Sequence, residues 1–241
     1  VYKRQANKEV DYSIMAIENT IGGSILPNYG FIEEYGLQIL GEEYLRITMQ
    51  LMAKPGQNLS DIDEVISHPM ALRQCMKYLS NHPHWKLTEA SDTAESAKII
   101  SEENLLGKAA IASSLAASTY GMEILAADIE TNKQNYTRFL IVGAENENHV
   151  HESNKASIRL ILSHEPGSLS KALIVLDKYG LNLTKIQSVP IIGKPYEYAI
   201  HFDIEFDQHE IYKTAMAEIK SLCYQINVMG VYRKGTSPVV V

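Results

Sequence analysis

Apolar and polar positions along residues 1–143 form short runs that predict strands interleaved with helices. A largely apolar run over 11–17 ends in the polar pair Glu18-Asn19 and is followed by glycines, as expected for a buried strand that enters a turn. Further strand-like runs cover 41–53, 65–67, 124–127 and 138–142. Strands that alternate with helices indicate an α/β domain with a largely parallel sheet.

Three segments of the same region have the features of helices. They are expected over 70–80, 93–102 and 107–120. Pro69 suits the first position of the first helix, and Asp92 with Glu95 three residues later resembles a capping box for the second. The third is rich in small residues and is predicted to end at Gly121 in a left-handed conformation.

The pattern changes after a polar, unpatterned stretch over 144–154, which is the best candidate for a linker. The elements expected beyond it are a strand over 156–163, a helix over 168–179, strands over 183–189 and 196–205, a helix over 209–222 and a strand over 226–231. This βαββαβ order is that of the ferredoxin-like module. The sequence therefore predicts two domains, over 1–143 and 155–234.

Composition narrows the class of protein. The net charge of −7 argues against nucleic acid as a partner, because no basic face is available to neutralise phosphates. No apolar run approaches the length of a membrane span, and no secretory signal opens the chain. Cys75 and Cys223 lie far apart within apolar patterns, as free thiols of a reducing cytoplasm do. We therefore expect a cytoplasmic protein with a small-molecule ligand.

The pentapeptide Asn135-Tyr136-Thr137-Arg138-Phe139 is the most informative candidate for chemistry. It places a hydroxyl beside a guanidinium where a polar loop enters an apolar run. Arginine holds carboxylates in bidentate geometry, and threonine supplies a short, stiff hydrogen-bond donor. The pair suits a small anionic substrate with a hydroxyl group to lose, whereas the structural alternative is a solvated strand end.

Two further polar sites lie at strand ends. Glu18-Asn19 follows a buried strand, where side chains face the crevice that binds ligands in open α/β sheets; an Asn-capped turn is the alternative. Ser67-His68-Pro69 stands at a strand-to-helix junction, where free N–H groups bind anions, and Gln74 is placed to reach the same crevice. Simple N-capping by Ser67 or His68 is the alternative there.

Taken together, these motifs resemble the prephenate dehydratase family in its monofunctional bacterial form, with a catalytic domain followed by an ACT regulatory domain. The catalytic stretches that match are Ile17-Glu18-Asn19-Thr20, Ser67-His68-Pro69-x-Ala71-Leu72-x-Gln74-Cys75, Asp92-Thr93-Ala94, 109–121 and Asn135-x-Thr137-Arg138-Phe139. The stretches that match the ACT module are Gly167-x-Leu169 and Asn182-Leu183-Thr184-Lys185-Ile186. The resemblance covers nearly the whole chain.

The resemblance implies a fold and a reaction. The expected catalytic domain has two α/β lobes joined by a hinge, like the type II periplasmic binding proteins, with the site in the cleft. A βαββαβ ferredoxin-like ACT domain follows it. Family members convert prephenate to phenylpyruvate in phenylalanine biosynthesis, a lyase reaction that uses no cofactor and no metal. They bind phenylalanine at the ACT dimer interface and lose activity, so a phenylalanine effector and a homodimer or homotetramer are expected.

The resemblance also implies roles for individual residues. The catalytic group is Thr137, Ser67, Gln74 and Asn19; the substrate-binding group is Arg138, Glu18, Phe139 and His68; the effector-binding group is Gly167, Ser168, Leu169, Asn182, Leu183, Gln187, Ser188 and Pro190. A threonine hydroxyl is too weak an acid to protonate a leaving group efficiently near neutrality. We therefore interpret Thr137 as a hydrogen-bond donor to the departing oxygen, with positioning as the larger contribution. Phe139 is expected to fix the Thr-Arg pair by packing.

The chain departs from the family pattern in three places. The family's catalytic domain begins further upstream, with a strand and a Gly-x-x-Gly-Ser/Thr-type segment; this chain opens at Val1, and we expect it to be a fragment with an unpaired sheet edge, whose stability and activity by itself the sequence leaves open. Met70 stands where the family often has Gln after Ser-His-Pro. The effector motif, usually Glu-Ser-Arg-Pro, reads Gln187-Ser188-Val189-Pro190, which weakens the case for phenylalanine feedback.

Two alternatives remain open at this point. Arogenate dehydratase has the same fold and makes phenylalanine directly, and nothing in the residues distinguishes it. A non-catalytic amino-acid-binding sensor built from the same modules is the alternative from another class, although Thr137, Arg138, Ser67 and Asn19 are intact. A serine nucleophile is not expected, because Ser113-Ser114 lacks a Gly-x-Ser-x-Gly turn and a neighbouring base.

Overall fold

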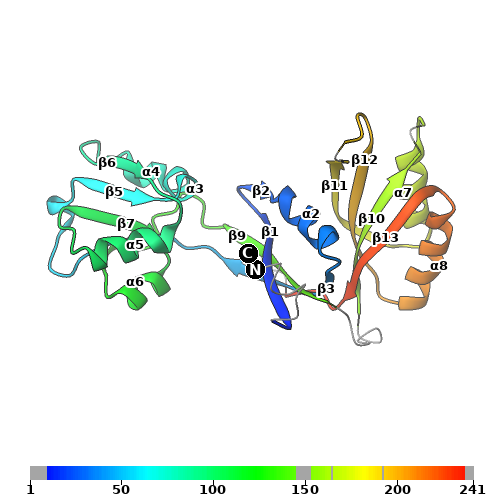
Figure 1. The fold of residues 1–241 in the computed structure, drawn as a ribbon, viewed down its shortest axis with the longest axis horizontal. Coiled ribbons are helices and arrows are strands. Elements are labelled where there is room, and N and C mark those ends of the chain that lie inside the picture. Colours follow the sequence, from blue (N-terminus) through cyan, green and yellow to red (C-terminus); the bar gives the residue numbers. More distant parts are fainter. Residues whose placement is uncertain (1–9, 145–152, 164, 192, 237–241) are drawn as a thin grey trace.

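The computed structural model of the chain describes residues 10–144, 153–163, 165–191 and 193–236. These residues form three sheets that follow one another along the long axis of the molecule (Figure 1). The first two sheets belong to two lobes of the N-terminal region, and the third belongs to the C-terminal domain. Among the described residues, no helix has the length and apolar content needed to cross a membrane.

The first lobe is an antiparallel sheet, sheet A, with the strand order β2-β1-β9-β3. Its elements are β1 (Tyr12–Asn19), β2 (Gly23–Ser24), α2 (Leu26–Glu34), β3 (Gln38–Arg46) and β9 (Tyr136–Gly143). Met15 and Ile17 of β1 and Leu140 of β9 are buried in one cluster with Tyr29 and Ile32 of α2. The helix therefore covers one face of the sheet, as Figure 1 shows.

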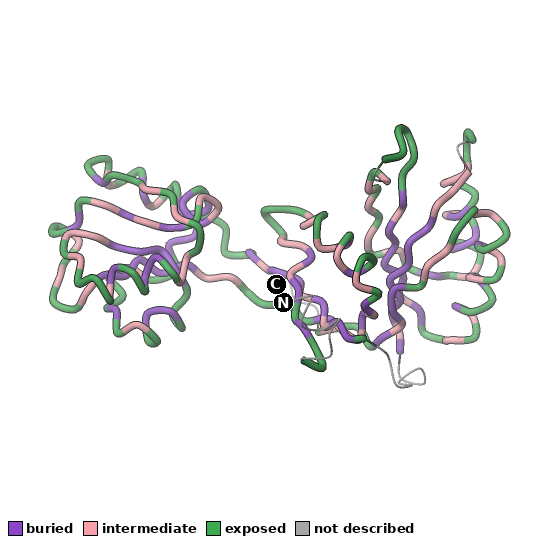
Figure 2. Tube along the Cα trace, viewed as in Figure 1, coloured by how far each residue is buried: buried purple, intermediate pink, exposed green. Residues whose placement is uncertain are grey.

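The second lobe is built on sheet B, with the strand order β6-β5-β7-β4-β8. Its elements are β4 (Gln50–Ala53), η1 (Leu59–Asp61), β5 (Glu64–Ser67), α3 (Pro69–Gln74), α4 (Met76–Leu79), β6 (Lys86–Glu89), α5 (Thr93–Glu102), β7 (Lys108–Ala112), α6 (Ser114–Tyr120) and β8 (Glu123–Ala126). The buried segments of Figure 2 run through the centre of this lobe, between its helices.

The two lobes confirm the α/β class, but the prediction of a largely parallel sheet is wrong. Only β5 is paired in parallel among the described strands, with β6 and β7, and all other pairs are antiparallel. The strand-like run over 41–53 is divided between β3 in sheet A and β4 in sheet B. Because the chain changes lobes between these strands, β4 enters sheet B beside β7 in the opposite direction.

Two predicted helices also differ from the structure. The run over 107–120 contains strand β7 and then helix α6, because its Ala109 to Ala112 segment is buried at the centre of sheet B. A short apolar run gives no periodic signal that separates a buried strand from a buried helix. The helix expected over 70–80 is interrupted at Cys75, which separates α3 from α4. Helix α5 has the predicted bounds, and Asp92 caps it by accepting from the N–H of Glu95 at 2.9 Å.

The C-terminal domain has the predicted βαββαβ order on an antiparallel sheet, sheet C, with the strand order β11-β12-β10-β13. Its elements are β10 (Lys155–Leu162), α7 (Ser168–Lys178), β11 (Asn182–Pro190), β12 (Tyr198–Glu205), α8 (His209–Lys220) and β13 (Cys223–Tyr232). Phe202 and Ile158 are buried with Val175 of α7 and Ala215 of α8, so both helices pack on the same core. The linker predicted over 144–154 lies mostly outside the described residues.

The open face of sheet C rests against the first lobe. Strand β13 contacts β3, and a Cβ atom built on Gly230 would lie 2.1 Å from the backbone oxygen of Ile39. Only glycine permits this approach. Met229 and Tyr232 on either side of this contact are buried in the same cluster as Met15 and Ile17 of β1. The C-terminal domain is thereby fixed to the lobe that carries β1 and β9.

Candidate active site between the lobes

The two lobes are joined by two chain segments, 47–49 and 127–135, that lie side by side. The N–H of Ile47 donates to the backbone oxygen of Asn135 at 2.7 Å, and the N–H of Ile129 donates to that of Met49 at 2.8 Å. The buried carboxylate of Glu130 accepts from the N–H of Met49 at 2.9 Å. These contacts make the two segments a paired hinge, and β9 begins directly after it.

Asn19 and Thr137 meet at the hinge end of sheet A. They are partners in the β1/β9 register, and the Nδ2 of Asn19 donates to the Oγ1 of Thr137 at 3.0 Å. The same Nδ2 donates to the Oδ1 of Asn135 at 2.8 Å, while the Oδ1 of Asn19 accepts from the N–H groups of Ile21 and Gly22. Asn19 is therefore held in one orientation by both ends of its amide.

The orientation of the Asn19 amide determines whether the Thr137 hydroxyl donates or accepts the hydrogen bond between them. Because Asn19 donates to its oxygen, the hydrogen of the hydroxyl is directed elsewhere. Among the described residues, Thr137 has no acceptor for that hydrogen, although its side chain is only 9% exposed. The Thr137 hydroxyl therefore has a hydrogen that no described residue accepts, and its role at a leaving oxygen stays a prediction.

Gln74 brings the second lobe into contact with this group. Its Oε1 accepts from the Nδ2 of the fully buried Asn135 at 3.0 Å, and its backbone oxygen accepts from the N–H of Thr131 at 2.8 Å. Gln74 also lines a cavity of about 510 Å³ between the lobes. The cavity is lined by Ile21, Gly22, Met70, Arg73, Gln74, Met76, Lys77, Thr131 and Asn132. Met70, one of the departures from the family pattern, thus faces the cleft opposite Gly22.

The cavity is basic on its second-lobe side. Arg73 and Lys77 are its charged lining residues, and both are exposed. A dianion small enough for the cavity would meet these two cations beside the amide of Gln74. Among the described residues, no group of three or more His, Cys, Asp or Glu side chains is suited to hold a metal ion.

Ser67 and His68 have structural partners in this arrangement. The buried hydroxyl of Ser67 donates to the backbone oxygen of Ile111 at 2.6 Å, which ties the end of β5 to β7. The Nδ1 of His68 accepts from the N–H of Met70 at 3.2 Å and caps α3. The structure thus gives His68 the N-capping position weighed from the sequence, and it brings neither side chain into the group formed by Asn19, Asn135 and Thr137.

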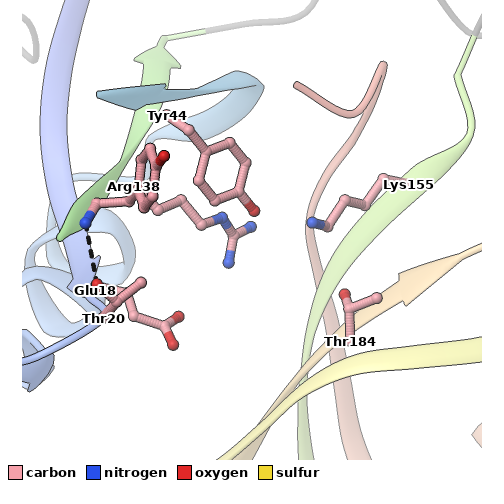
Figure 3. A pocket seen from close by; sticks show the side chains of 7 residues that line it. Glu18, Thr20, Tyr44, Arg138, Lys155 and Thr184 are labelled. Carbon is pink, nitrogen blue, oxygen red and sulfur yellow. Dashed lines mark hydrogen bonds between the residues drawn. The ribbon is translucent and has the colours of Figure 1, made fainter. Parts of the chain in front are cut away.

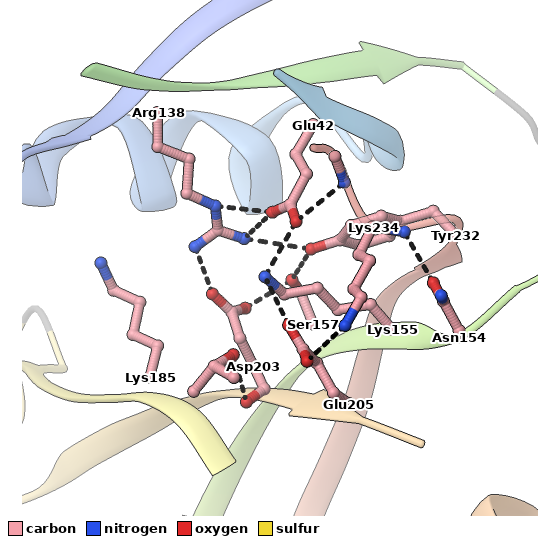
Figure 4. Close-up of polar contacts among 12 residues, drawn as sticks. Glu42, Arg138, Asn154, Lys155, Ser157, Lys185, Asp203, Glu205, Tyr232 and Lys234 are labelled. Atoms are coloured by element: carbon pink, nitrogen blue, oxygen red, sulfur yellow. Dashed lines mark hydrogen bonds and ion pairs between the residues drawn. The ribbon is translucent and has the colours of Figure 1, made fainter. Parts of the chain in front are cut away.

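The structure separates Arg138 from Thr137, contrary to the predicted pairing. Adjacent residues of a strand point to opposite faces, and the guanidinium of Arg138 lies between sheets A and C (Figure 4). It is 6% exposed, binds a carboxylate of Glu42 at 2.6 Å, pairs with Asp203 and donates to the hydroxyl of Tyr232 at 3.1 Å. Most of its N–H groups are therefore bonded to protein groups, and the predicted substrate-binding role of Arg138 stays a prediction.

The electrostatics of Arg138 follow from this environment. Burial works to lower the pKa of its guanidinium, but the negative charges of Asp203 and Glu42 outweigh burial and hold that pKa above its usual value. Burial and Asp203 likewise raise the pKa of the Tyr232 hydroxyl well above its usual value. Lys155 adds a second cation at Glu42, at 2.9 Å. The contact between the domains is thus a fully paired, buried network of charges.

Glu18 and Phe139 complete the predicted substrate-binding group. Glu18 lies on the same side as Arg138, where its carboxylate pairs with Lys185 of the C-terminal domain. Glu18 and Arg138 both line a separate cavity of about 140 Å³ between sheets A and C (Figure 3). Phe139 is half-buried and shares the face of Thr137 by strand alternation, on the face opposite Arg138, and the packing role predicted for it stays a prediction.

The predicted effector residues fall into two places. Gly167 has a φ of 83° directly before α7, and Ser168 and Leu169 line a cavity of about 370 Å³ together with Tyr196, Tyr198 and Tyr224. The remaining candidates, Asn182, Leu183, Gln187, Ser188 and Pro190, lie on β11, at an edge of sheet C. The structure does not bring this second group to the cavity.

Sequence reasoning overlooked Asn135, Glu42 and Asp203. Asn135 stands in the matched motif, and its position two residues before Thr137 was a signal that went unused. Glu42 and Asp203 gave no signal, because they lie on strands whose sequences are ordinary and their partner is distant along the chain.

Comparison with known proteins identifies the family to which the chain belongs. A family model described as prephenate dehydratase matches residues 1–147. A bifunctional chorismate mutase/prephenate dehydratase of Aquifex aeolicus is 35% identical over 236 residues, which are 97% of this chain and 64% of that protein. Arogenate dehydratase/prephenate dehydratase 2, chloroplastic, of Arabidopsis thaliana is 36% identical over 243 residues, or 95% of this chain and 62% of the relative. The chain thus spans less than two thirds of the length of these relatives.

Solved structures agree with the fold. The prephenate dehydratase of Arthrobacter aurescens in complex with L-Phe superposes with a TM-score of 0.85 at 28% identity, over 99% of this chain and 80% of that one. A protein described as GqqA, a novel type of quorum quenching acylase, superposes with a TM-score of 0.88 at 26% identity, over 98% and 86% of the two chains. The residues matched by the family model include the hinge, both lobes, Asn19 and Thr137. The chain therefore belongs to the prephenate dehydratase family.

Proposed function

We propose that this chain catalyses the decarboxylating dehydration of prephenate to phenylpyruvate in the cleft between its lobes. The observation that carries the proposal is the hydrogen bond from Asn19 to the oxygen of Thr137. It leaves the Thr137 hydroxyl as a fixed donor for the departing ring oxygen. Family membership and the names of the relatives support the same reaction.

The reaction makes modest demands on the protein. The bond from the ring to its carboxylate breaks and releases carbon dioxide, and the electron pair enters the ring. The bond to the ring hydroxyl breaks, and the leaving oxygen takes up a proton and departs as water. Aromatisation drives the process, so the site needs to orient a dianion and stabilise the leaving oxygen. A donor such as Thr137 suits the second task.

Arg73 and Lys77 are the residues we assign to the substrate's carboxylates. They are the cations of the cavity that Gln74 lines, whereas Arg138 is occupied by Glu42 and Asp203. Gln74 and Asn135 hold the lobes at the separation that the substrate fits. Ser67 supports the site from behind by tying β5 to β7.

The C-terminal domain is, in this proposal, an ACT regulatory domain that binds phenylalanine. The cavity beside Ser168 and Leu169 has an aromatic lining suited to that side chain, and a solved family member is in complex with L-Phe. Strand β11 carries Gln187 and Val189, which belong to the effector motif that differs from the family pattern. It lies at an edge of sheet C, where its outer side could pair with a second copy of the chain. A homodimer would then place two such motifs side by side.

An assay of purified protein for phenylpyruvate formation tests the proposal. Prephenate should be converted, and a Thr137→Ala variant should not convert it at a comparable rate. Absence of turnover in the unmodified chain would overturn the proposal.

Arogenate is the second candidate substrate, favoured by the names of the Arabidopsis relatives. A competition assay with both compounds decides between them by the ratio of kcat/KM values. Acyl hydrolysis, suggested by the GqqA neighbour, is disfavoured because the buried hydroxyl of Ser67 is already donated to Ile111. An acylase assay of the same preparation should therefore give no product.

A further inference from the structure

Two neighbouring residue pairs at the end of the β1/β9 ladder face opposite sides of sheet A. Asn19 is in register with Thr137, and Glu18 is in register with Arg138. The first pair meets at the cleft, whereas each member of the second pair binds a charged side chain of the C-terminal domain. A β-bulge between Ala16 and Glu18 shifts the register immediately before these pairs.

The contact through Arg138 is made by several buried groups. Asp203 of β12 pairs with its guanidinium, and the other carboxylate oxygen of Asp203 accepts from the hydroxyl of Ser157 at 2.5 Å. That hydroxyl lies 2.8 Å from the hydroxyl of Tyr232. Figure 4 shows these groups converging on Arg138 from strands of both sheets. Since an unpaired buried charge is costly, a shift of sheet C that broke these contacts would be opposed.

The contact through Glu18 is equally direct. Lys185 of β11 pairs with the Glu18 carboxylate and donates to the hydroxyl of Ser24 at 3.0 Å. Its ammonium lies 5.4 Å from the centre of the Tyr29 ring, and its side chain is 8% exposed. Lys185 stands two residues before Gln187, on the strand that carries the effector motif.

We propose that Glu18 and Arg138 are positioning residues, through which the C-terminal domain sets the placement of Asn19 and Thr137. Each is adjacent in the chain to the residue it positions, so a displacement of β11 or β12 reaches the cleft through one peptide unit. A displacement on the order of 1 Å at a catalytic group changes rates strongly. The inference rests on the proposed function, because its readout is the turnover of prephenate.

The test uses Asp203→Asn and Glu18→Gln in the full chain. Each variant should lower kcat by about tenfold or more while KM changes by no more than about threefold. Lys185→Gln should reproduce the effect of Glu18→Gln, and the double variant should show no further loss, because both remove the same contact. In all three single variants, the inhibition by added phenylalanine should weaken.

Glu33→Gln is the matched control. Glu33 of α2 pairs with Arg159 of β10 at 3.2 Å across the same interface, and among the described residues its carboxylate is not bonded to a side chain of β1 or β9. This variant should retain the kcat and the phenylalanine response of the unmodified chain. Thermal melting of each variant reports whether it is folded. If Asp203→Asn does not fold, Glu18→Gln still provides the test, because Glu18 is partly exposed.

The outcomes separate the two proposals. An unmodified chain without prephenate turnover would overturn the proposed function and this inference together. An active chain whose Glu18→Gln, Lys185→Gln and Asp203→Asn variants lose only melting temperature, with unchanged kcat, would overturn the positioning role alone. A rise in KM confined to Glu18→Gln, without an effect of Lys185→Gln, would make Glu18 a substrate ligand and also overturn it.

Discussion

Thr137 and Arg138 are consecutive residues of β9, yet their side chains serve different parts of the molecule. Thr137 accepts from Asn19 at 3.0 Å beside the hinge, while Arg138 is bonded to Glu42 and Asp203 between two domains. The motif that carries the family signature thus combines a residue of the cleft with a residue of the domain interface. The predictions below separate these roles.

Removing the Thr137 hydroxyl should affect turnover far more than binding. Loss of one hydrogen-bond donor to a developing negative charge costs roughly 10²- to 10³-fold in kcat, so Thr137→Ala should show this loss with a small change in KM. Steady-state kinetics measure both. Thr214→Ala, which removes an exposed hydroxyl on α8, is the control. Equal losses in kcat and binding would contradict the assignment.

Arg138→Met should unfold the protein more readily. It leaves the buried carboxylate of Asp203 without its cation and leaves Glu42 with Lys155 alone, and breaking a buried pair in this way costs about 3–5 kcal/mol. Urea unfolding measures the difference. Arg138→Lys should also be harmful, because a single ammonium lacks the planar fork that spans both carboxylates. A raised KM with unaltered stability would instead return Arg138 to the substrate.

Asn135→Ala should weaken the contact between the lobes. The change leaves the buried Oε1 of Gln74 without its donor, and an unsatisfied buried group costs about 1–3 kcal/mol. Urea unfolding and kcat should both report the loss. Asn81→Ala, at an exposed position of the second lobe outside the cavity lining, should leave both unchanged. If the two variants behaved alike, the Asn135–Gln74 hydrogen bond would have no special importance.

Arg73→Gln should raise KM for prephenate about tenfold or more, because one cation facing the dianion is lost. The kcat at saturating substrate should change much less, since Arg73 is not placed at the leaving oxygen. Lys98→Gln on α5 removes the same charge from a distant exposed position and should have no effect. Equal behaviour of the two variants would remove Arg73 from the site.

The stability of the protein should depend on His201 in acid. Burial, aided by the positive charge of Arg159, lowers the pKa of His201 from 6.5 to about 4. Because the folded state holds the imidazole neutral, its contribution is complete above pH 6.5 and is lost as the pH falls from 6.5 towards 4. The loss amounts to roughly 3 kcal/mol. Melting temperatures at several pH values should therefore fall less steeply in His201→Phe.

Residues of the candidate site could be predicted because strand ends and helix starts could be predicted. Asn19 follows a recognisable buried strand, and Gln74 lies on a helix whose Pro69 start is marked in the sequence. Strand alternation alone would also have placed Thr137 and Arg138 on opposite faces, had the motif been treated as part of β9. The prediction instead treated the two side chains as one site, whereas the structure directs them to different partners.

The partners of Arg138 could not be predicted from the sequence around it. Glu42 lies 96 residues before it and Asp203 lies 65 residues after it, and neither stands in a recognisable motif. The transfer of the chain from sheet A to sheet B was hidden for a similar reason. A continuous apolar stretch over 41–53 does not reveal that its halves belong to different sheets.

The burial of Met229 and Tyr232 in the cluster around Met15 determines how this chain can be dissected. A fragment that stops after residue 143 would lose part of the packing of its first lobe and expose β3 where Gly230 now lies, so it should be insoluble or only partly folded. The second lobe draws its two apolar clusters entirely from residues 49–129 and should fold as an excised piece. A cut at the polar stretch before residue 155 should therefore cost the first lobe its packing partner, whereas the inserted lobe should keep its core when it is excised.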